Sequence, residues 1–158
     1  MSTYLPPRPR TIPGKRLFAV VASKFNPDYM EGLVNHATAE LRVLAPNAAV
    51  TLHQVPGAFE IPIVVRELAS QKTAAAIIAL GVIIKGKTGH AEHLARSVTD
   101  ALQRIAIEEG VPVINAVLSV VDEKQARERC LGEKINRGTE AARAAVEIAD
   151  VIAGLRSK

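Results

Sequence analysis

The residues best suited to chemistry stand in one short segment, where an apolar, strand-like run ends in Lys85–His90. Glycines in this segment let a ligand approach the backbone closely. Free N–H groups at the start of a helix attract anions, and Lys87 adds a positive charge there. His90 can carry a proton near neutral pH. These features favour a phosphate cradle at Gly86–Thr88 with a proton carrier beside it; the alternative is an ordinary strand-to-helix turn.

Predicted strands and helices that alternate along the chain would position this segment. Continuous β-branched apolar runs are typical of strands buried on both faces, and apolar residues at helical spacing predict the helices between them. The strands are expected at Leu17–Ala22, Ala48–Gln54, Ala74–Ile84 and Pro112–Val120, and the helices at Asp28–Leu44, Ala58–Ala69, Glu92–Glu109, Asp122–Cys130 and Thr139–Leu155. This order predicts an α/β fold with three layers, in which helices cover both faces of a four-stranded parallel sheet.

In such sheets, ligands bind outside the carboxyl ends of the strands. Candidate chemistry lies at four predicted strand ends: Ser23–Asn26, Val55–Glu60, Lys85–His90 and Asn115–Asp122. Phe25 could stack on a planar ring or fold back onto the domain edge. Glu60 could accept hydrogen bonds from a sugar alcohol, or its charge could only stabilise the positive end of the helix dipole that follows it. The shared position of these segments supports the phosphate-cradle interpretation.

Two further residues are given structural roles. Phe59 is expected in the core. Cys130, the only cysteine, is expected to be a buried small residue rather than a nucleophile, because no paired base is evident. A single cysteine excludes an internal disulfide and a cysteine-based zinc site, and the four histidines form no recognisable metal pattern. No metal is therefore expected.

Length and composition favour one domain that binds a small anionic substrate. The chain has 158 residues, of which 3% are aromatic, and a net charge of +4. Because so few side chains could stack on bases, nucleic acid is a poor candidate partner. No apolar run is long enough for a membrane span and no signal peptide is evident, so no membrane partner and a cytoplasmic location are expected.

Residues 1–15 are expected to form an extended arm, and residues 16–158 a single domain. The arm contains Pro6, Pro7, Pro9 and Pro13, which exclude a regular helix or a central strand. Two alternatives are open for the arm: it is disordered, or it lies on a neighbouring subunit.

Five segments, in this order, resemble the lumazine synthase family, which makes 6,7-dimethyl-8-ribityllumazine in riboflavin biosynthesis. They are Ser23–Asn26, Val55–Pro62, Ala79–His90, Gln125–Arg129 and Asn136–Gly138. Each is a weak signal alone, but five in order at suitable separations are highly specific. The resemblance runs from about Arg16 to Ala153. It implies a flavodoxin-like domain that assembles as a pentamer or as an icosahedral capsid of sixty subunits.

The resemblance implies a transferase without a cofactor. It would condense 5-amino-6-(D-ribitylamino)uracil with 3,4-dihydroxy-2-butanone 4-phosphate and release phosphate and water. His90 would be the general acid/base. The pyrimidine and its ribityl chain would contact Phe25, Ala58, Phe59, Glu60, Val82, Ile83, Ile84 and, from a neighbouring subunit's strand end, Asn115. The phosphate would be held by Gly86, Lys87, Thr88 and a neighbour's Arg129, with Arg137 as a further candidate.

The chain departs from the family pattern near His90. Lys87 stands where many relatives have Glu or a small residue, Ala91 where an aromatic is common, and His93 where Tyr is common. Arg137 replaces a frequent Lys. Two other functions are compatible with the fold: an archaeal-type riboflavin synthase, whose reaction has no phosphate substrate, and a non-catalytic protein that binds flavin or lumazine.

Overall fold

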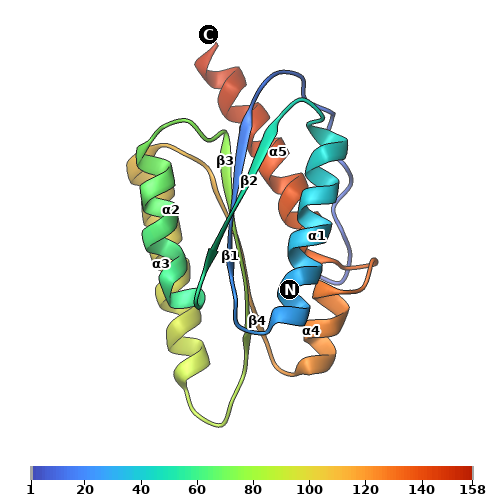
Figure 1. Cartoon of the computed structure of the whole chain (residues 1–158), viewed down its shortest axis with the longest axis vertical. Coiled ribbons are helices and arrows are strands. Elements are labelled where there is room, and N and C mark those ends of the chain that lie inside the picture. Colours follow the sequence, from blue (N-terminus) through green and yellow to red (C-terminus); the bar gives the residue numbers. More distant parts are fainter. Residues whose placement is uncertain (1, 158) are drawn as a thin grey trace.

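Strands and helices alternate in the computed structural model, which describes residues 2–157 (Figure 1). The strands are β1 (Leu17–Ser23), β2 (Ala49–Val55), β3 (Ala76–Ile84) and β4 (Val113–Val120). The helices are α1 (Pro27–Leu44), α2 (Ile61–Ser70), α3 (His90–Glu109), α4 (Glu123–Cys130) and α5 (Arg137–Arg156), and a 3₁₀ turn, η1 (Ala58–Glu60), precedes α2. Every element expected from the sequence is present, with boundaries shifted by at most a few residues.

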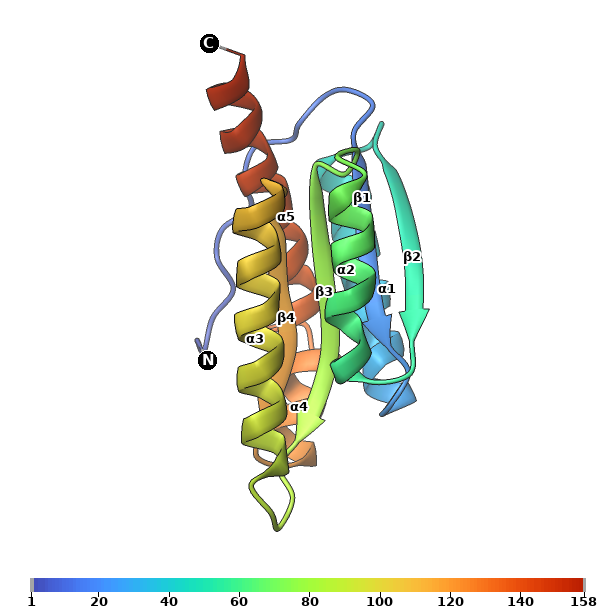
Figure 2. The ribbon, with the colours of Figure 1, turned by 90° about the vertical axis from the view of Figure 1, so that its left-hand side faces the viewer.

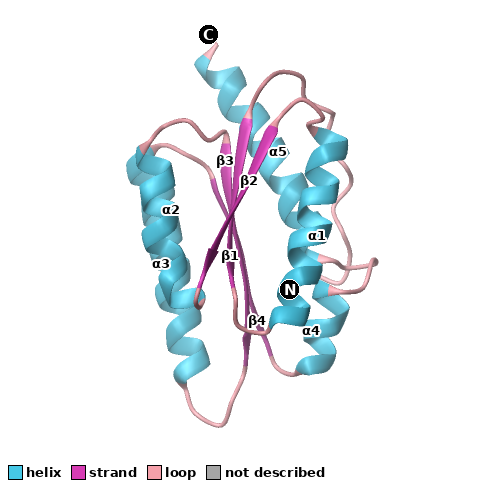
Figure 3. Cartoon of the chain, viewed as in Figure 1, coloured by secondary structure: helices cyan, strands magenta, loops and turns pink. Residues whose placement is uncertain are grey.

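The strands form one parallel sheet in the order β2-β1-β3-β4. Helices α1, α4 and α5 cover one face and α2 and α3 cover the other, as Figures 2 and 3 show from two sides. Side chains alternate between the faces: Phe18 and Leu80 pack beneath α1 and α5, whereas Val21 and Ile77 pack beneath α2 and α3. The predicted three-layer, flavodoxin-like fold is therefore confirmed.

Local signals in the sequence set the ends of several helices. The Asp122 carboxylate accepts a hydrogen bond from the backbone N–H of Gln125 at 2.8 Å, which is the predicted N-cap of α4. Pro62 lies in the first turn of α2, where a missing N–H does no harm. Gly110 ends α3 with a left-handed φ of 66°. These caps fix where the loops at the ends of the strands begin and end.

The N-terminal arm lies on its own chain, along α1 and α5 (Figure 2). Ile12 is fully buried in the core between these helices, and its N–H donates to the carbonyl of Leu44 at 2.8 Å. Arg10 pairs with Asp150 through two contacts of 2.6 Å. Within the single chain the arm is therefore held by its own helices, and contact of the arm with a neighbouring subunit stays a prediction. The sequence interpretation considered the prolines and overlooked arginines with acidic partners far along the chain.

A buried carboxylate joins the arm to two helices. Both oxygens of Glu40 in α1 accept from Arg8 of the arm, at 2.9 and 3.1 Å, and one accepts from Arg143 of α5 at 2.6 Å. Burial raises the pKa of the Glu40 carboxyl, but the hydrogen bonds from both arginines outweigh it and hold this pKa below its usual value. The cluster therefore stabilises the fold above the pKa of an unfolded Glu, about 4.3, and this stability is lost as pH falls through the lower folded pKa.

We expect Glu40→Gln to lower the melting temperature at about pH 7 and to differ less from the original chain at acidic pH, as the pH falls through the lowered pKa of the folded carboxyl. Thermal unfolding followed by circular dichroism measures this difference. Asp150→Asn, which breaks the exposed pair with Arg10, is the matched control and should change stability little. An equal loss from Glu40→Gln at neutral and at acidic pH would show that the charge of Glu40 is not what stabilises the cluster.

Candidate active site

An aromatic ring and a carboxylate lie together at the carboxyl ends of β1 and β2. A Cβ atom on Gly57 would lie 2.7 Å from the ring of Phe25, so only glycine leaves room for that ring. The Glu60 carboxylate accepts from the backbone N–H of Gly57 at 3.0 Å. Phe25 nevertheless remains 67% exposed. Its ring therefore rests on Gly57 and keeps a surface on which a planar ligand could stack.

Strand β3 extends beyond its neighbour on one side. Its pairing with β1 ends at Leu80, whereas its pairing with β4 continues to Ile84. Asn26, in a left-handed conformation after β1, donates from its side chain to the carbonyl of Val82 at 3.0 Å. Val82 and Ile83 have buried side chains and Ile84 is half-buried. Beyond Leu80 this end of β3 has no partner strand on the β1 side, and contact of these three residues with a substrate stays a prediction.

The predicted phosphate cradle forms an exposed loop between β3 and α3 (Figure 1). The loop is tied to the sheet at its start, where the N–H of Lys85 donates to Val120 at 2.9 Å. Gly86, Lys87 and Thr88 follow, and His90 is the exposed first residue of α3. A Cβ on Gly86 would meet no atom within 4 Å, so open space surrounds this backbone. The structure thus places an exposed glycine-containing backbone and a lysine in one loop, and a histidine at the first residue of the helix that follows it.

The turn η1 carries Glu60 and contacts both β3 and α3, the elements on either side of the cradle loop. Ala58, the first residue of the turn, is buried. Phe59 is 70% exposed and lines a surface groove between α2 and α3, so the expectation that Phe59 belongs to the core is wrong. The turn directs Phe59 outward because Ala58 and Ile61 occupy the two positions that face the core. The structure therefore gathers Phe25, Glu60 and the cradle loop at one end of the sheet.

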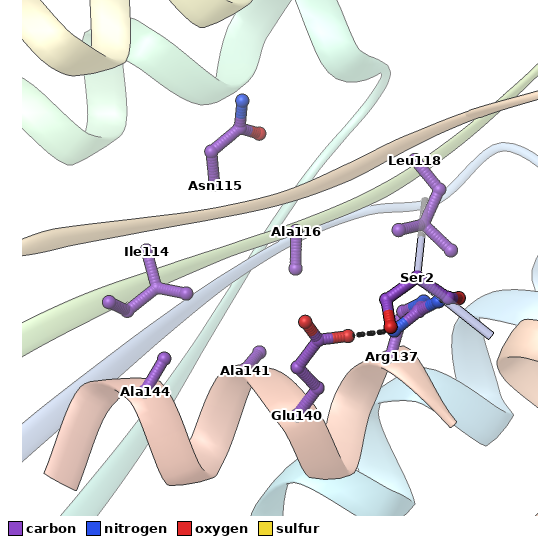
Figure 4. A pocket seen from close by; sticks show the side chains of 9 residues that line it. All are labelled: Ser2, Ile114, Asn115, Ala116, Leu118, Arg137, Glu140, Ala141 and Ala144. Carbon is purple, nitrogen blue, oxygen red and sulfur yellow. Dashed lines mark hydrogen bonds and ion pairs between the residues drawn. The ribbon is translucent and has the colours of Figure 1, made fainter. Parts of the chain in front are cut away.

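Asn115 does not lie with these residues. It is the third residue of β4, opposite Ala79, and five residues before Val120; at about 3.3 Å per residue it lies about 16 Å from the strand end. The expectation that Asn115 stands at a strand end is therefore wrong, because β4 begins only two residues earlier. Its side chain donates to Thr99 of α3 at 3.1 Å and points away from the face that carries Ala116 (Figure 4).

A pocket of about 330 Å³ lies between β4 and α5 (Figure 4). Its apolar lining consists of Ile114, Ala116, Leu118, Ala141 and Ala144. Its polar lining residues are Arg137, Glu140, Ser2 and Asn115. The guanidinium of Arg137 contacts both the Glu140 carboxylate and the Ser2 carbonyl, and Arg137 is 4% exposed. Sequence reasoning missed this pocket; the signal was the small and apolar alternation on an edge strand opposite an alanine-rich helix.

Arg129 is a buried cation without a strong partner. It lies on α4 and is 8% exposed, and its Nε and Nη1 atoms have no hydrogen-bond partner among the described residues. The nearest carboxylate, Glu128, is 3.6 Å from Nη1. A buried guanidinium with unpaired N–H groups is suited to bind an anion from outside the chain, because charge-assisted hydrogen bonds would satisfy those groups.

Cys130, the next residue, is fully buried, and burial raises the pKa of its thiol to about 12. The thiol is therefore protonated near neutral pH, as expected for a structural cysteine.

Comparison with known proteins agrees with the motifs. Residues 15–153 match the sequence profile of the 6,7-dimethyl-8-ribityllumazine synthases. The chain belongs to this family. Three relatives carry the name 6,7-dimethyl-8-ribityllumazine synthase. That of Azoarcus sp. (strain BH72) is 37% identical over 84% of this chain and 83% of its own length. Those of Nitrosomonas europaea and Leptothrix cholodnii are 40% and 41% identical, over 84% and 87% of this chain and 79% and 87% of their own lengths.

Within residues 2–157, no helix is long and apolar enough to cross a membrane. In the same part of the chain, no three His, Cys, Asp or Glu side chains come together in a way that could hold a metal ion.

Proposed function

We propose that this chain condenses 5-amino-6-(D-ribitylamino)uracil with 3,4-dihydroxy-2-butanone 4-phosphate to give 6,7-dimethyl-8-ribityllumazine. The amine and the ketone form an imine with loss of water, phosphate leaves, and the ring closes with loss of a second water. The match to the lumazine synthase family over residues 15–153 carries this proposal. The gathering of Phe25, Glu60 and the cradle loop at one end of the sheet supports it.

Each group suits one step of this reaction. A leaving phosphate favours the exposed backbone of Gly86 and Thr88 and the charge of Lys87. Imine formation and ring closure need protons moved near neutral pH, which suits His90 at the start of α3. The ring of Phe25 would hold the pyrimidine, and Glu60 would accept from its ribityl hydroxyls. Binding two reactants side by side supplies much of the rate.

We infer that each active site is shared by two copies of the chain. Within one chain, Asn115 lies near the start of β4, away from the strand ends that hold Phe25 and His90. Arg137 begins α5, which covers the opposite face of the sheet from the helix that His90 begins. A site that combines Asn115 and Arg137 with Phe25 and His90 is complete only where the edge strand β4 of one copy approaches the strand ends of another. This arrangement makes a homo-oligomer necessary for activity. The cytoplasmic location expected from the sequence stays a prediction.

We expect the full chain to form a pentamer or a larger shell. Apolar side chains such as Phe59, Ile63 and Ile107 are exposed in the single chain, and oligomers bury such surfaces. Light scattering should give a mass at least five times the 16.9 kDa of the chain. A stable, folded monomer that is fully active would contradict the shared site.

One assay tests the reaction against its alternatives. The purified protein is mixed with both substrates, and a fluorescent lumazine and free phosphate are measured together. A lumazine synthase yields both in equal amounts. A riboflavin synthase would instead consume added lumazine and release no phosphate, and a binding protein would do neither.

A further inference from the structure

The N-terminal arm reaches the pocket between β4 and α5. The backbone carbonyl of Ser2 accepts a hydrogen bond from Nη2 of Arg137, and Ser2 lines the pocket (Figure 4). On the other side, the carboxylate of Glu140 pairs with Nη1 of the same guanidinium. Contacts from two sides fix the direction of Arg137, which is almost wholly buried.

Contacts along α5 determine where the arm ends. Arg143 donates from Nη1 to the carbonyl of Pro6 at 2.5 Å and from Nε to Glu40 at 2.6 Å. Arg8 binds the same carboxylate with two N–H groups. The α5 residues that contact the arm follow the same order as their partners in the arm, so the arm runs parallel to α5. The contacts of Pro6 and Arg8 with α5 and α1 therefore hold the arm so that Ser2 lies at the pocket.

We propose that the arm is part of the substrate site and that the Ser2 carbonyl, together with Glu140, orients Arg137 toward the unphosphorylated substrate; this inference rests on the proposed function. Glu140 balances the charge of Arg137, so a phosphate dianion there would meet a carboxylate. A guanidinium has five N–H groups, and contacts within residues 2–157 engage only two of them. The others suit carbonyl or hydroxyl oxygens, and the apolar lining suits a flat ring or a carbon chain.

Arg129 and Arg137, the two buried arginines within residues 2–157, differ in how closely a carboxylate pairs with them. Glu128 lies 3.6 Å from Arg129 and is itself 46% exposed, so it neutralises Arg129 weakly. Arg129 therefore suits the phosphorylated ketone, and Arg137 suits the uncharged polyol-bearing pyrimidine. The arm acts on one substrate only, through Arg137, which makes Ser2 a positioning residue rather than a catalytic one.

Deletion of residues 2–5, with the start methionine kept, tests this role. The deletion removes the Ser2 carbonyl and leaves the anchors at Pro6 and Arg8 in place. The KM for the pyrimidine should rise roughly 2- to 10-fold, the effect of losing one hydrogen bond that holds the guanidinium. The KM for the ketone phosphate and kcat should stay unchanged. The melting temperature is measured in parallel, and Arg10→Ala, at the far end of the arm, is the control expected to leave both KM values unchanged.

A double-mutant cycle separates positioning from general destabilisation. In an Arg137→Ala background, deletion of residues 2–5 should raise the pyrimidine KM no further, because the group that the arm orients is gone. Additive effects would overturn the proposal, and so would an unchanged or lowered pyrimidine KM in the deletion alone. If the undeleted chain forms no lumazine, the proposed function fails and this inference with it. If the undeleted chain is active and the deletion has no effect, only the role of the arm fails.

Discussion

His90→Ala should slow turnover under saturating substrate by up to about 10²–10⁴-fold, the usual contribution of a general acid–base group. His90 is exposed, begins α3 and directly follows the cradle loop, so it would reach a substrate if that loop binds the substrate's phosphate. The loss could fall at the lower end of this range, since positioning of two reactants supplies much of the rate. Initial rates of lumazine fluorescence at saturating concentrations of both substrates measure the effect.

His93→Ala is the matched control, and we expect a much smaller loss. His93 lies one turn further along α3, and its ring is 3.6 Å from the position that a Cβ of Gly89 would occupy. Both histidines thus lie beside the cradle loop, so a difference between the two variants would come from the role of the side chain and not from its distance to the loop. If His93→Ala loses most of the turnover rate and His90→Ala keeps it, the alignment of this loop with the family is wrong and the catalytic assignment fails.

The sequence predicted the fold almost completely, because each element carries its own signal. β-Branched runs marked the strands, and Asp122, Pro62 and Gly110 marked helix ends by local chemistry. Long-range packing was less accessible. Phe59 was assigned to the core by its residue type, yet a 3₁₀ turn rather than a regular helix holds it outside. Residue type alone does not tell which way a short turn faces.

The candidate site was predictable where it follows strand ends and not where it depends on distant partners. Phe25, Glu60 and the cradle loop share one end of the sheet because carboxyl ends of parallel strands meet there. The contacts of the arm with Arg137 and Arg143 join residues more than 130 positions apart in the chain. No local pattern specifies such pairs, and only the fold brings them together.

Arg129→Ala should weaken binding of the phosphorylated ketone by roughly 1.5–3 kcal/mol, or about 10- to 150-fold, and affect the pyrimidine far less. Among residues 2–157 the buried Nε and Nη1 atoms of Arg129 have no hydrogen-bond partner, so the phosphate would supply acceptors for them. Separate KM values for the two substrates measure this. Arg127→Ala, an exposed position on the same helix, is the control and should leave both values unchanged. Equal weakening of both substrates would mean that Arg129 supports the structure instead.

Mixing the variants tests whether a neighbour supplies Arg129. If each site takes His90 from one subunit and Arg129 from the next, coassembly of His90→Ala with Arg129→Ala chains leaves about one quarter of the sites with both residues intact, because subunits enter a symmetric ring at random. Activity should then rise well above that of either variant alone after joint refolding. If both residues of a site come from one chain, no mixed oligomer contains an intact site, and mixing restores nothing. The same two variants therefore test the proton carrier, the phosphate ligand and the subunit interface that unites them.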